Sequence, residues 1–266
     1  MNCKAAGFAA GVIPPLLFGI FIIVLSETRL LHIILRVSEV QLPTVDNILR
    51  VLMENRSKAL HDSWVTVQVF LAGIVIGSAT GFLAALFAAL SPVWGGGGLA
   101  IISAFNAIPI VALSPIMRLW FASSPFAAKT AVVSIVSMVA MSVNVYRGLT
   151  DLKPFALDLI ESFAGAKADV FFKLRLPNCL PYIFTALRIN IAAAMIGVII
   201  SEYFAASVEG LGFEIRNSLR TMQMTVGWAY ILAASVIGIG FFALAANLER
   251  FLFRHRRHLK APSETA

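Results

Sequence analysis

Apolar residues along the chain gather into six stretches, each near the length that a helix needs to cross a bilayer. A spanning helix requires about 20 mostly apolar residues. The stretches occupy residues 5–26, 64–90, 99–117, 126–146, 181–203 and 221–248. This pattern predicts an all-α polytopic membrane protein in which residues 1–266 form one transmembrane domain with about six spanning helices. Arg188 lies inside the fifth stretch, and we expect its long side chain to reach toward the cytoplasmic interface.

The composition supports membrane residence. Hydrophobic residues make up 59% of the chain and charged residues only 13%, with a mean hydropathy of +0.86. A soluble protein carries about 25% charged residues because water must solvate its surface. The net charge of +7 is attributed to basic residues that flank the spans, so we expect no nucleic-acid partner. Cys3 and Cys179 provide neither a disulfide framework nor a metal-binding cluster.

The orientation follows from the basic residues. An even number of spans places both termini on one side, and Lys and Arg beside spans favour the cytoplasm. Basic residues are dense at 254–260, directly after the last span, and recur in the loop at 147–180. We therefore expect both termini and this loop in the cytoplasm. The first stretch is predicted to be retained rather than cleaved as a signal peptide, because five further spans follow.

The loop at 147–180 contains two short amphipathic segments. Apolar residues at Leu157, Ile160 and Phe163 recur at helical spacing, and Pro154 suits the helix start. Small residues at 164–166 permit a bend, and a second apolar stripe leads to Leu176-Pro177. Pro177 and Pro181 are predicted to interrupt the path into the fifth span. The residues alone support two interpretations equally. The loop is either a helix that lies on the inner membrane surface or a docking element for a cytoplasmic partner.

This loop resembles the signature of permease subunits of binding-protein-dependent ABC transporters. The signature has an acidic residue, a glycine six positions later and a Leu-Pro pair twelve positions beyond. The matching positions are Asp158, Leu159, Ile160, Ala164, Gly165, Leu176 and Pro177. Here Asp replaces the usual Glu, bulky residues replace an alanine pair, and the glycine is displaced by one position. Residues 107–121 and 200–215 and the LPTVDNIL segment are also similar to permeases for nitrate, taurine, aliphatic sulfonates and pyrimidine precursors.

The resemblance implies an ABC type I importer permease in the bacterial cytoplasmic membrane. Two permease subunits, identical or different, would pair within membrane lipid, and an ATPase subunit would dock on each cytoplasmic loop. A periplasmic or tethered solute-binding protein would deliver a small polar or anionic solute. ATP would be bound by the ATPase, so this chain is expected to need no cofactor, to bind no metal and to have no catalytic residues of its own.

Several polar residues lie within the apolar stretches. Asn106, Asn144 and Asn190 either line the solute pathway or form hydrogen bonds between helices, since an amide in hydrocarbon needs a partner. Glu202 is expected to pair with Arg216 or Arg220, or to cap the backbone of the turn at 210–212. Glycines at 73, 77 and 81 recur every four residues and predict a helix-packing face.

Two other classes of protein are alternatives. A proton-coupled secondary transporter typically has internal repeats and carboxylates at mid-depth, and the predicted spans contain neither. An intramembrane enzyme needs a catalytic constellation, and all four histidines fall outside the spans. The sequence therefore favours an ATP-driven importer permease, with a secondary transporter as the alternative.

Overall fold

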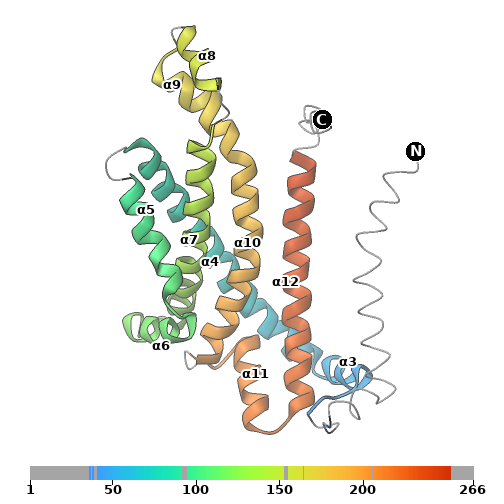
Figure 1. The fold of residues 1–266 in the computed structure, drawn as a ribbon. Coiled ribbons are helices and arrows are strands. Elements are labelled where there is room, and N and C mark those ends of the chain that lie inside the picture. The colour runs from blue at the N-terminus through green and yellow to red at the C-terminus, as the bar shows by residue number, and fades with distance from the viewer. Residues whose placement is uncertain are drawn as a thin grey trace, which may run out of the picture. The chain divides into compact units, whose positions relative to one another are not determined.

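The structure is a computed structural model that describes residues 36, 38, 41–91, 95–152, 155–163, 165–204 and 207–252. All regular secondary structure in these ranges is helical, and they contain no strand (Figure 1). The all-α fold class is confirmed. The chain divides into two compact units, one of Met1–His61 with Glu214–Ala233 and the other of Asp62–Phe213 with Ala234–Ala266. The prediction of a single domain over residues 1–266 stays a prediction.

The helices follow one another with short connections. In chain order they are α3 (Val45–Glu54), α4 (Arg56–Leu90), α5 (Gly95–Ala104), the 3₁₀ turn η1 (Phe105–Ala107), α6 (Ile110–Trp120), α7 (Pro125–Thr150), α8 (Ala156–Ser162), α9 (Lys167–Asp169), the π-helical segment η2 (Val170–Arg175), α10 (Leu176–Phe204), α11 (Leu211–Arg220) and α12 (Met224–Leu252). Helix α7 illustrates why an element begins where it does. Pro125 occupies its first position, and the Ser124 hydroxyl accepts a hydrogen bond from the Ala127 N–H at 3.2 Å.

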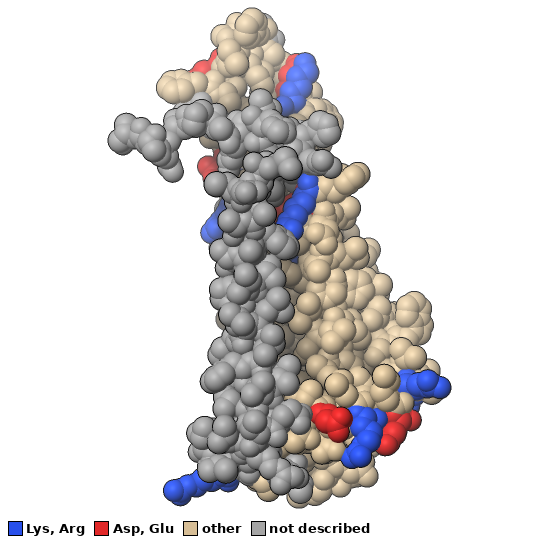
Figure 2. Space-filling view, turned by 90° about the vertical axis from the view of Figure 1, so that its right-hand side faces the viewer, with Lys and Arg blue, Asp and Glu red and all other residues tan. Residues whose placement is uncertain are grey.

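Four helices of the described ranges are long and apolar enough to cross a membrane, namely Arg56–Leu90, Pro125–Thr150, Lys167–Phe204 and Met224–Leu252. They contain the predicted spans at 64–90, 126–146 and 181–203, and the last of them covers 221–248 from Met224 onward. Figure 2 shows a broad surface without Lys, Arg, Asp or Glu side chains among the residues that it draws in tan. Hydrocarbon requires such a surface, because a charge at mid-depth is costly. The predicted first span at 5–26 lies outside the described residues.

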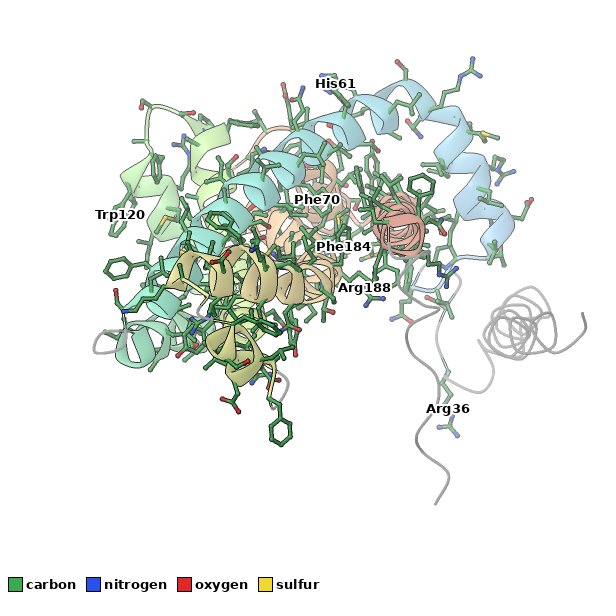
Figure 3. All side chains as sticks on the ribbon, turned by 90° about the horizontal axis from the view of Figure 1, so that it is seen from above. Arg36, His61, Phe70, Trp120, Phe184 and Arg188 are labelled. Atoms are coloured by element: carbon green, nitrogen blue, oxygen red, sulfur yellow. The ribbon has the colours of Figure 1, made fainter. Side chains whose placement is uncertain are left out.

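The predicted third span, residues 99–117, is wrong as a single helix. The chain bends by 100° between Gly97–Ala107 and Ile110–Trp120, so this region forms a broken span or a re-entrant loop. Pro109 explains the bend, because a proline disfavours helical backbone in the residue before it. Ile108 is accordingly extended, with ψ at 120°, and Pro109 becomes the N-cap of α6. At the end of α6, Trp120 is 74% exposed and points away from the other helices (Figure 3).

Helices α4 and α7 approach closely through the three glycines of α4. A Cβ atom at Gly73 would collide with the Val133 side chain, and one at Gly77 or Gly81 would collide with a backbone carbonyl of α7. Val133 also belongs to an apolar core with Val69, Phe70 and residues of α10. The glycine stripe is therefore a helix-packing face, as the sequence predicted.

Gly77→Ala should destabilise the protein, because the new methyl group would push the Ser134 carbonyl away from α4. Overpacking of this kind costs about 1–3 kcal/mol, which exceeds the helix propensity that alanine gains. The measurement is the thermal unfolding midpoint of the purified permease. Gly240→Ala is the matched control, because a Cβ atom there meets nothing within 4 Å and should leave the midpoint equal or raised. Equal midpoints for the two variants would contradict the close packing of α4 on α7.

Candidate functional site: the coupling loop and the Glu202 cluster

Helix α8 in the predicted coupling loop divides its apolar residues between two sides. Leu157 and Ile160 are half-buried, and α8 contacts η2. Phe163, which the sequence assigned to the same stripe, is 79% exposed. Asp158 is also exposed, in the first turn of the helix. The inner side thus holds the loop together, and the remaining apolar residues are left on the surface.

Three large apolar side chains are exposed together at α8. Phe155, Leu159 and Phe163 are 80%, 60% and 79% exposed. We call these three residues the α8 patch. Leu159 lies within α8, and Phe155 and Phe163 flank the helix at its two ends. Phe155 lies in the left-handed region with φ at 67°, a conformation that costs a non-glycine residue about 1 kcal/mol or more. An exposed apolar patch of this kind indicates contact with another protein or with lipid.

Gly165 closes the C-terminal end of α8. Its N–H donates to the Ile160 carbonyl oxygen at 3.0 Å, as in a glycine-type helix cap. A Cβ atom at Gly165 would lie 2.5 Å from Ile160 Cγ2 and 2.9 Å from that carbonyl oxygen. A substitution here would disturb the fold of the loop itself, so a loss of partner binding in such a variant could not be assigned to docking alone. Ala164 lies outside the described residues.

The coupling loop continues into α10 without a break. Residues Lys167–Phe204 form one helical run, and the prediction that Pro177 and Pro181 interrupt it is wrong. The π-helical segment η2 explains this continuity. The Leu176 N–H bonds to the carbonyl oxygen five residues back, at Phe171, and Pro177 then enters in the first turn of α10, where its missing N–H is tolerated.

The base of the loop is attached firmly to α7. The Asn178 amide donates to the Gly148 and Asp151 carbonyl oxygens at 2.9 and 3.0 Å, which caps the C-terminal end of α7. Cys179 is buried in a core with Val145, and Phe171 packs against that core. Gly148 has room for no Cβ, since one would lie 2.9 Å from the Cys179 Cα. Motion of the loop must therefore carry α10 with it.

Glu202 lies fully buried near the C-terminal end of α10. The Thr66 hydroxyl contacts both carboxylate oxygens at 3.0 and 3.1 Å, and the Gly212 N–H donates to Oε2 at 2.9 Å. This confirms the predicted capping of the turn at 210–212. Lys129 Nζ is 3.6 Å from Oε1, so the ion-pair partner within this unit is a lysine that the sequence did not suggest. Arg216 belongs to the other unit, and its pairing with Glu202 stays a prediction.

Further polar contacts surround this carboxylate. Thr66 Oγ1 also accepts the Leu211 N–H at 3.0 Å, and Asp62 Oδ1 accepts the Gly210 N–H at 3.1 Å. Lys129 Nζ bonds to Ser207 Oγ at 3.4 Å. Gly210 has φ at 106°, which favours glycine, and a Cβ atom there would collide with Glu202. We call Asp62, Thr66, Lys129, Glu202 and Ser207 the Glu202 cluster; it joins α4, α7 and α10 to the turn before α11.

Comparison with known proteins identifies the family. Residues 77–254, which include the coupling loop, match the family described as binding-protein-dependent transport system inner membrane component. The chain belongs to this family. It is 33% identical over 154 residues to the formylaminopyrimidine transport permease protein ThiX of Halalkalibacterium halodurans, an alignment that covers 58% of this chain and 61% of ThiX. It is 30% identical over 195 residues to a probable ABC transporter permease protein of Haemophilus influenzae, covering 71% of this chain and 79% of that protein.

The fold has a counterpart among solved structures of ABC transporters. A crystal structure of an amino acid ABC transporter with histidines matches with a TM-score of 0.61 at 17% identity, and covers 75% of this chain and 96% of the other. At this identity the likeness supports the fold alone. The family match identifies the chain as a multi-pass permease component of the ABC transporter type that the sequence resemblance implied. Its described residues contain no group of three or more His, Cys, Asp or Glu side chains placed to hold a metal ion.

The three asparagines of this permease occupy different surroundings. Asn190 is fully buried, and its amide donates to the Ser137 carbonyl oxygen at 3.0 Å and to Ser78 Oγ at 3.3 Å, which links α10 to α7 and α4. Asn144 is half-buried and donates to its own helix at Ala140, 2.7 Å away. Asn106 is exposed in η1 beside a cavity of about 60 Å³. These contacts give Asn190 an interhelical role, and a pathway role for the three residues stays a prediction.

Arg188 of the permease has a partner that the sequence did not suggest. Arg188 Nη1 lies 3.2 Å from Glu249 Oε2, and Figure 3 shows the side chain between α10 and α12. Arg188 thus forms an ion pair between two helices, and its reach toward the cytoplasmic interface stays a prediction. Its sequence signal was an acidic residue at the end of the last apolar stretch, one position before Arg250. The pair joins α12 to the same helix that carries the coupling loop.

Proposed function

We propose that this chain is the membrane-spanning permease subunit of an ATP-driven ABC importer and forms part of the pathway for a small solute. The observation that carries this proposal is the α8 patch, an exposed apolar surface on an element that contacts η2, the segment that leads into α10. A separate ATPase subunit that binds ATP would cover the patch in the cytoplasm. A second permease, identical or different, would complete the pathway, and a periplasmic or tethered solute-binding protein would deliver the solute.

The loop and both termini are proposed to face the cytoplasm of a bacterium, because the basic residues at 147–175 and 250–260 flank the spans on that side. ATPase closure would move α8, and the continuous helix Lys167–Phe204 would transmit this motion as a rigid body. The solute class follows from the relatives: ThiX is named for formylaminopyrimidine transport, and we infer a small solute of comparable size.

The alternative of a proton-coupled secondary transporter receives less support. Such a transporter needs a carboxylate that gains and loses a proton within the membrane. In α10 and α12, Glu202 and Glu249 lie toward helix ends, and both are paired with cations, Lys129 and Arg188. A cytoplasmic partner would cover the exposed apolar patch, whereas in a transporter without one the patch would have to lie against lipid.

The double variant Leu159→Ala/Phe163→Ala tests this function. It removes most of the α8 patch, and loss of well-buried contact residues in an interface costs about 2 kcal/mol or more, equivalent to about 30-fold in affinity. We expect the ATPase to co-purify poorly and solute uptake to fall, while the permease still inserts in the membrane. The measurement is co-purification of the ATPase together with uptake at equal permease abundance.

Met53→Ala is the matched control, because Met53 is 73% exposed but lies on α3, which is predicted to be on the opposite side of the membrane. It should assemble and transport as the wild type does.

Asp158→Lys adds a second discrimination. A docking surface should lose the ATPase on this charge reversal, whereas a helix on the inner leaflet should bind anionic lipid more tightly. Normal assembly and uptake in the double variant would overturn the proposal.

A further inference from the structure

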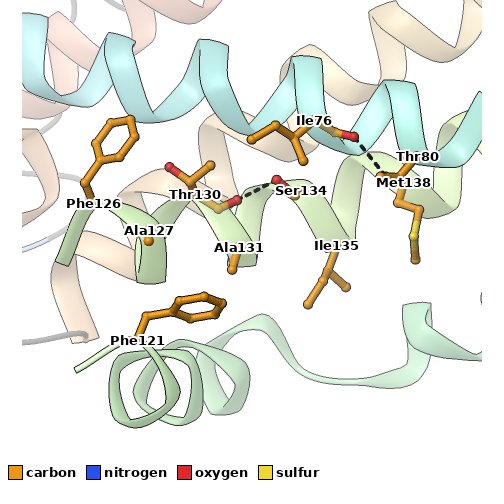
Figure 4. Close-up of a pocket in the computed structure, with 10 residues that line it drawn as sticks. All are labelled: Ile76, Thr80, Phe121, Phe126, Ala127, Thr130, Ala131, Ser134, Ile135 and Met138. Atoms are coloured by element: carbon orange, nitrogen blue, oxygen red, sulfur yellow. Dashed lines mark hydrogen bonds between the residues drawn. The ribbon is translucent and has the colours of Figure 1, made fainter. Parts of the chain in front are cut away.

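The groove between α4 and α7 is apolar, apart from hydroxyls that are already engaged or buried. The Thr80 and Ser134 hydroxyls donate to carbonyl oxygens of their own helices at 2.9 and 2.8 Å (Figure 4), and Thr130 is buried. The remaining lining side chains are apolar. The groove therefore offers a ligand apolar contact alone. Helix α3 differs, because its exposed apolar side chains lie directly beside charged ones.

One side of α3 is packed against the protein. Ile48, Val51 and Leu52 are half-buried, and they recur at the spacing of one helix face. Asn47 lies next to this face, and it lines a cavity together with residues 222–226 of the turn into α12. The Asn55 side chain caps the end of the helix by donating to the Val51 carbonyl oxygen at 2.9 Å. These contacts fix which sides of α3 are left exposed.

The exposed surface of α3 has an apolar side and a charged side. Leu49 and Met53 are 48% and 73% exposed, and they lie four residues apart on one helix face. At about 100° per residue, Asp46, Arg50 and Glu54 occupy the next face around the helix, and all three are exposed. A narrow apolar face between a packed face and a charged face is the arrangement of a helix in a membrane surface, with protein, lipid and water on its three sides.

Helix α3 leads directly into a membrane-spanning helix. It ends at Glu54, and α4 begins at Arg56, so a single residue joins the two. On α4, Leu60 and Trp64 are 70% and 60% exposed, and Trp64 begins the apolar stretch of this span. Tryptophan is enriched at the level of the lipid headgroups. Leu60 lies one turn before it, about 6 Å along the helix, so the lipid-facing surface of α4 extends toward α3.

We propose that α3 lies in the membrane surface, with Leu49 and Met53 inserted into the leaflet where α4 begins. In this position α3 holds the first turns of α4 at the level of the headgroups. Asp46, Arg50 and Glu54 mix both signs of charge, so the apolar face provides the binding and anionic lipid is not required. The narrowness of that face and its direct connection to a span favour lipid over a soluble protein partner. The proposal is independent of ATPase docking at the α8 patch.

The test measures the membrane depth of spin labels on α3 of the purified permease in phosphatidylcholine vesicles. Cys3 and Cys179 are replaced by Ala, and one cysteine at a time is introduced and labelled with a nitroxide. Collisions of the label with oxygen, which concentrates in lipid, and with a nickel chelate, which stays in water, give the depth. Val75→Cys is the reference, because Val75 is 65% exposed within the span of α4 and its label should lie deep in the hydrocarbon.

The adjacent pairs Leu49→Cys with Arg50→Cys and Met53→Cys with Glu54→Cys are matched, because each pair shares one stretch of backbone. Labels at 49 and 53 should lie about 5–10 Å below the lipid phosphates. Labels at 50 and 54 should lie at the phosphates or above them. Equal exposure to the nickel chelate at all four positions would overturn the proposal. Labels at 49 and 53 that are shielded from both oxygen and nickel would also overturn it, since they would show contact with protein instead of lipid.

Discussion

Insertion of one alanine after Phe172 should abolish coupled uptake while the permease remains folded in the membrane. Phe172 lies in η2, where the π-helical turn already holds one residue more than an α-helical turn would. A further residue that this turn does not take up would rotate the preceding segment by about 100° relative to α10. The α8 patch would then point away from its present direction. Coupling requires that the α8 patch faces the ATPase while α10 keeps its place in the membrane. We therefore expect uptake to fall by about tenfold or more, equivalent to about 1.4 kcal/mol of lost coupling.

Phe172→Ala separates the rotation from a mere change of sequence in η2. Phe172 is 64% exposed, so the substitution keeps the chain length and removes little buried contact. It should retain most uptake. Both variants are compared at equal membrane abundance by uptake, ATPase co-purification and thermal midpoint. Uptake that survives the insertion would show that the direction of the α8 patch is unimportant, and equal losses in both variants would show that the rotation is not the cause.

The sequence predicted the spans because a long apolar stretch is a local property. Each of the stretches 64–90, 126–146 and 181–203 lies within one continuous helix. The glycine stripe was predictable for the same reason, since spacing along one helix defines a face. The break at Ile108–Pro109 also has a local cause in the sequence. Hydropathy averaged over a whole predicted span, however, does not reveal a single proline. Because a proline disfavours helical backbone in the residue before it, Pro109 alone was enough to predict two helices in place of the third span.

The partners of the charged residues could not be predicted in this way. Capping of the turn at 210–212 was one of the two roles that the sequence suggested for Glu202, and it was predictable because that turn follows closely in the chain. Its ion-pair partner, Lys129, lies on α7 instead, and Arg188 finds Glu249 on α12. Such pairs depend on which helices pack together, and a single sequence does not encode that packing in any short pattern.

Glu202→Gln should lower the stability of the permease by about 3 kcal/mol or more, because it leaves the Lys129 ammonium buried without a countercharge. The Lys129 side chain is only 6% exposed, and its remaining contact is the Ser207 hydroxyl at 3.4 Å. Glutamine can still accept the Gly212 N–H through its carbonyl oxygen, so the turn at 210–212 keeps that bond. The loss is therefore assigned to the ion pair. Thermal unfolding of the purified permease should show a midpoint lower by several degrees.

The double variant Glu202→Gln/Lys129→Met decides whether the ion pair or the hydrogen bonds hold the Glu202 cluster. Methionine fills the space of the lysine stem without a charge, and replacing both members of a buried pair is often neutral or stabilising. The double variant should therefore melt well above Glu202→Gln and near the wild type. Glu202→Ala should remain destabilised with either residue at position 129, because it also removes the acceptor for Thr66 and Gly212. A wild-type midpoint for Glu202→Gln alone would show that the lysine pair adds no stability, and that the backbone contacts of the turn hold α4, α7 and α10 together.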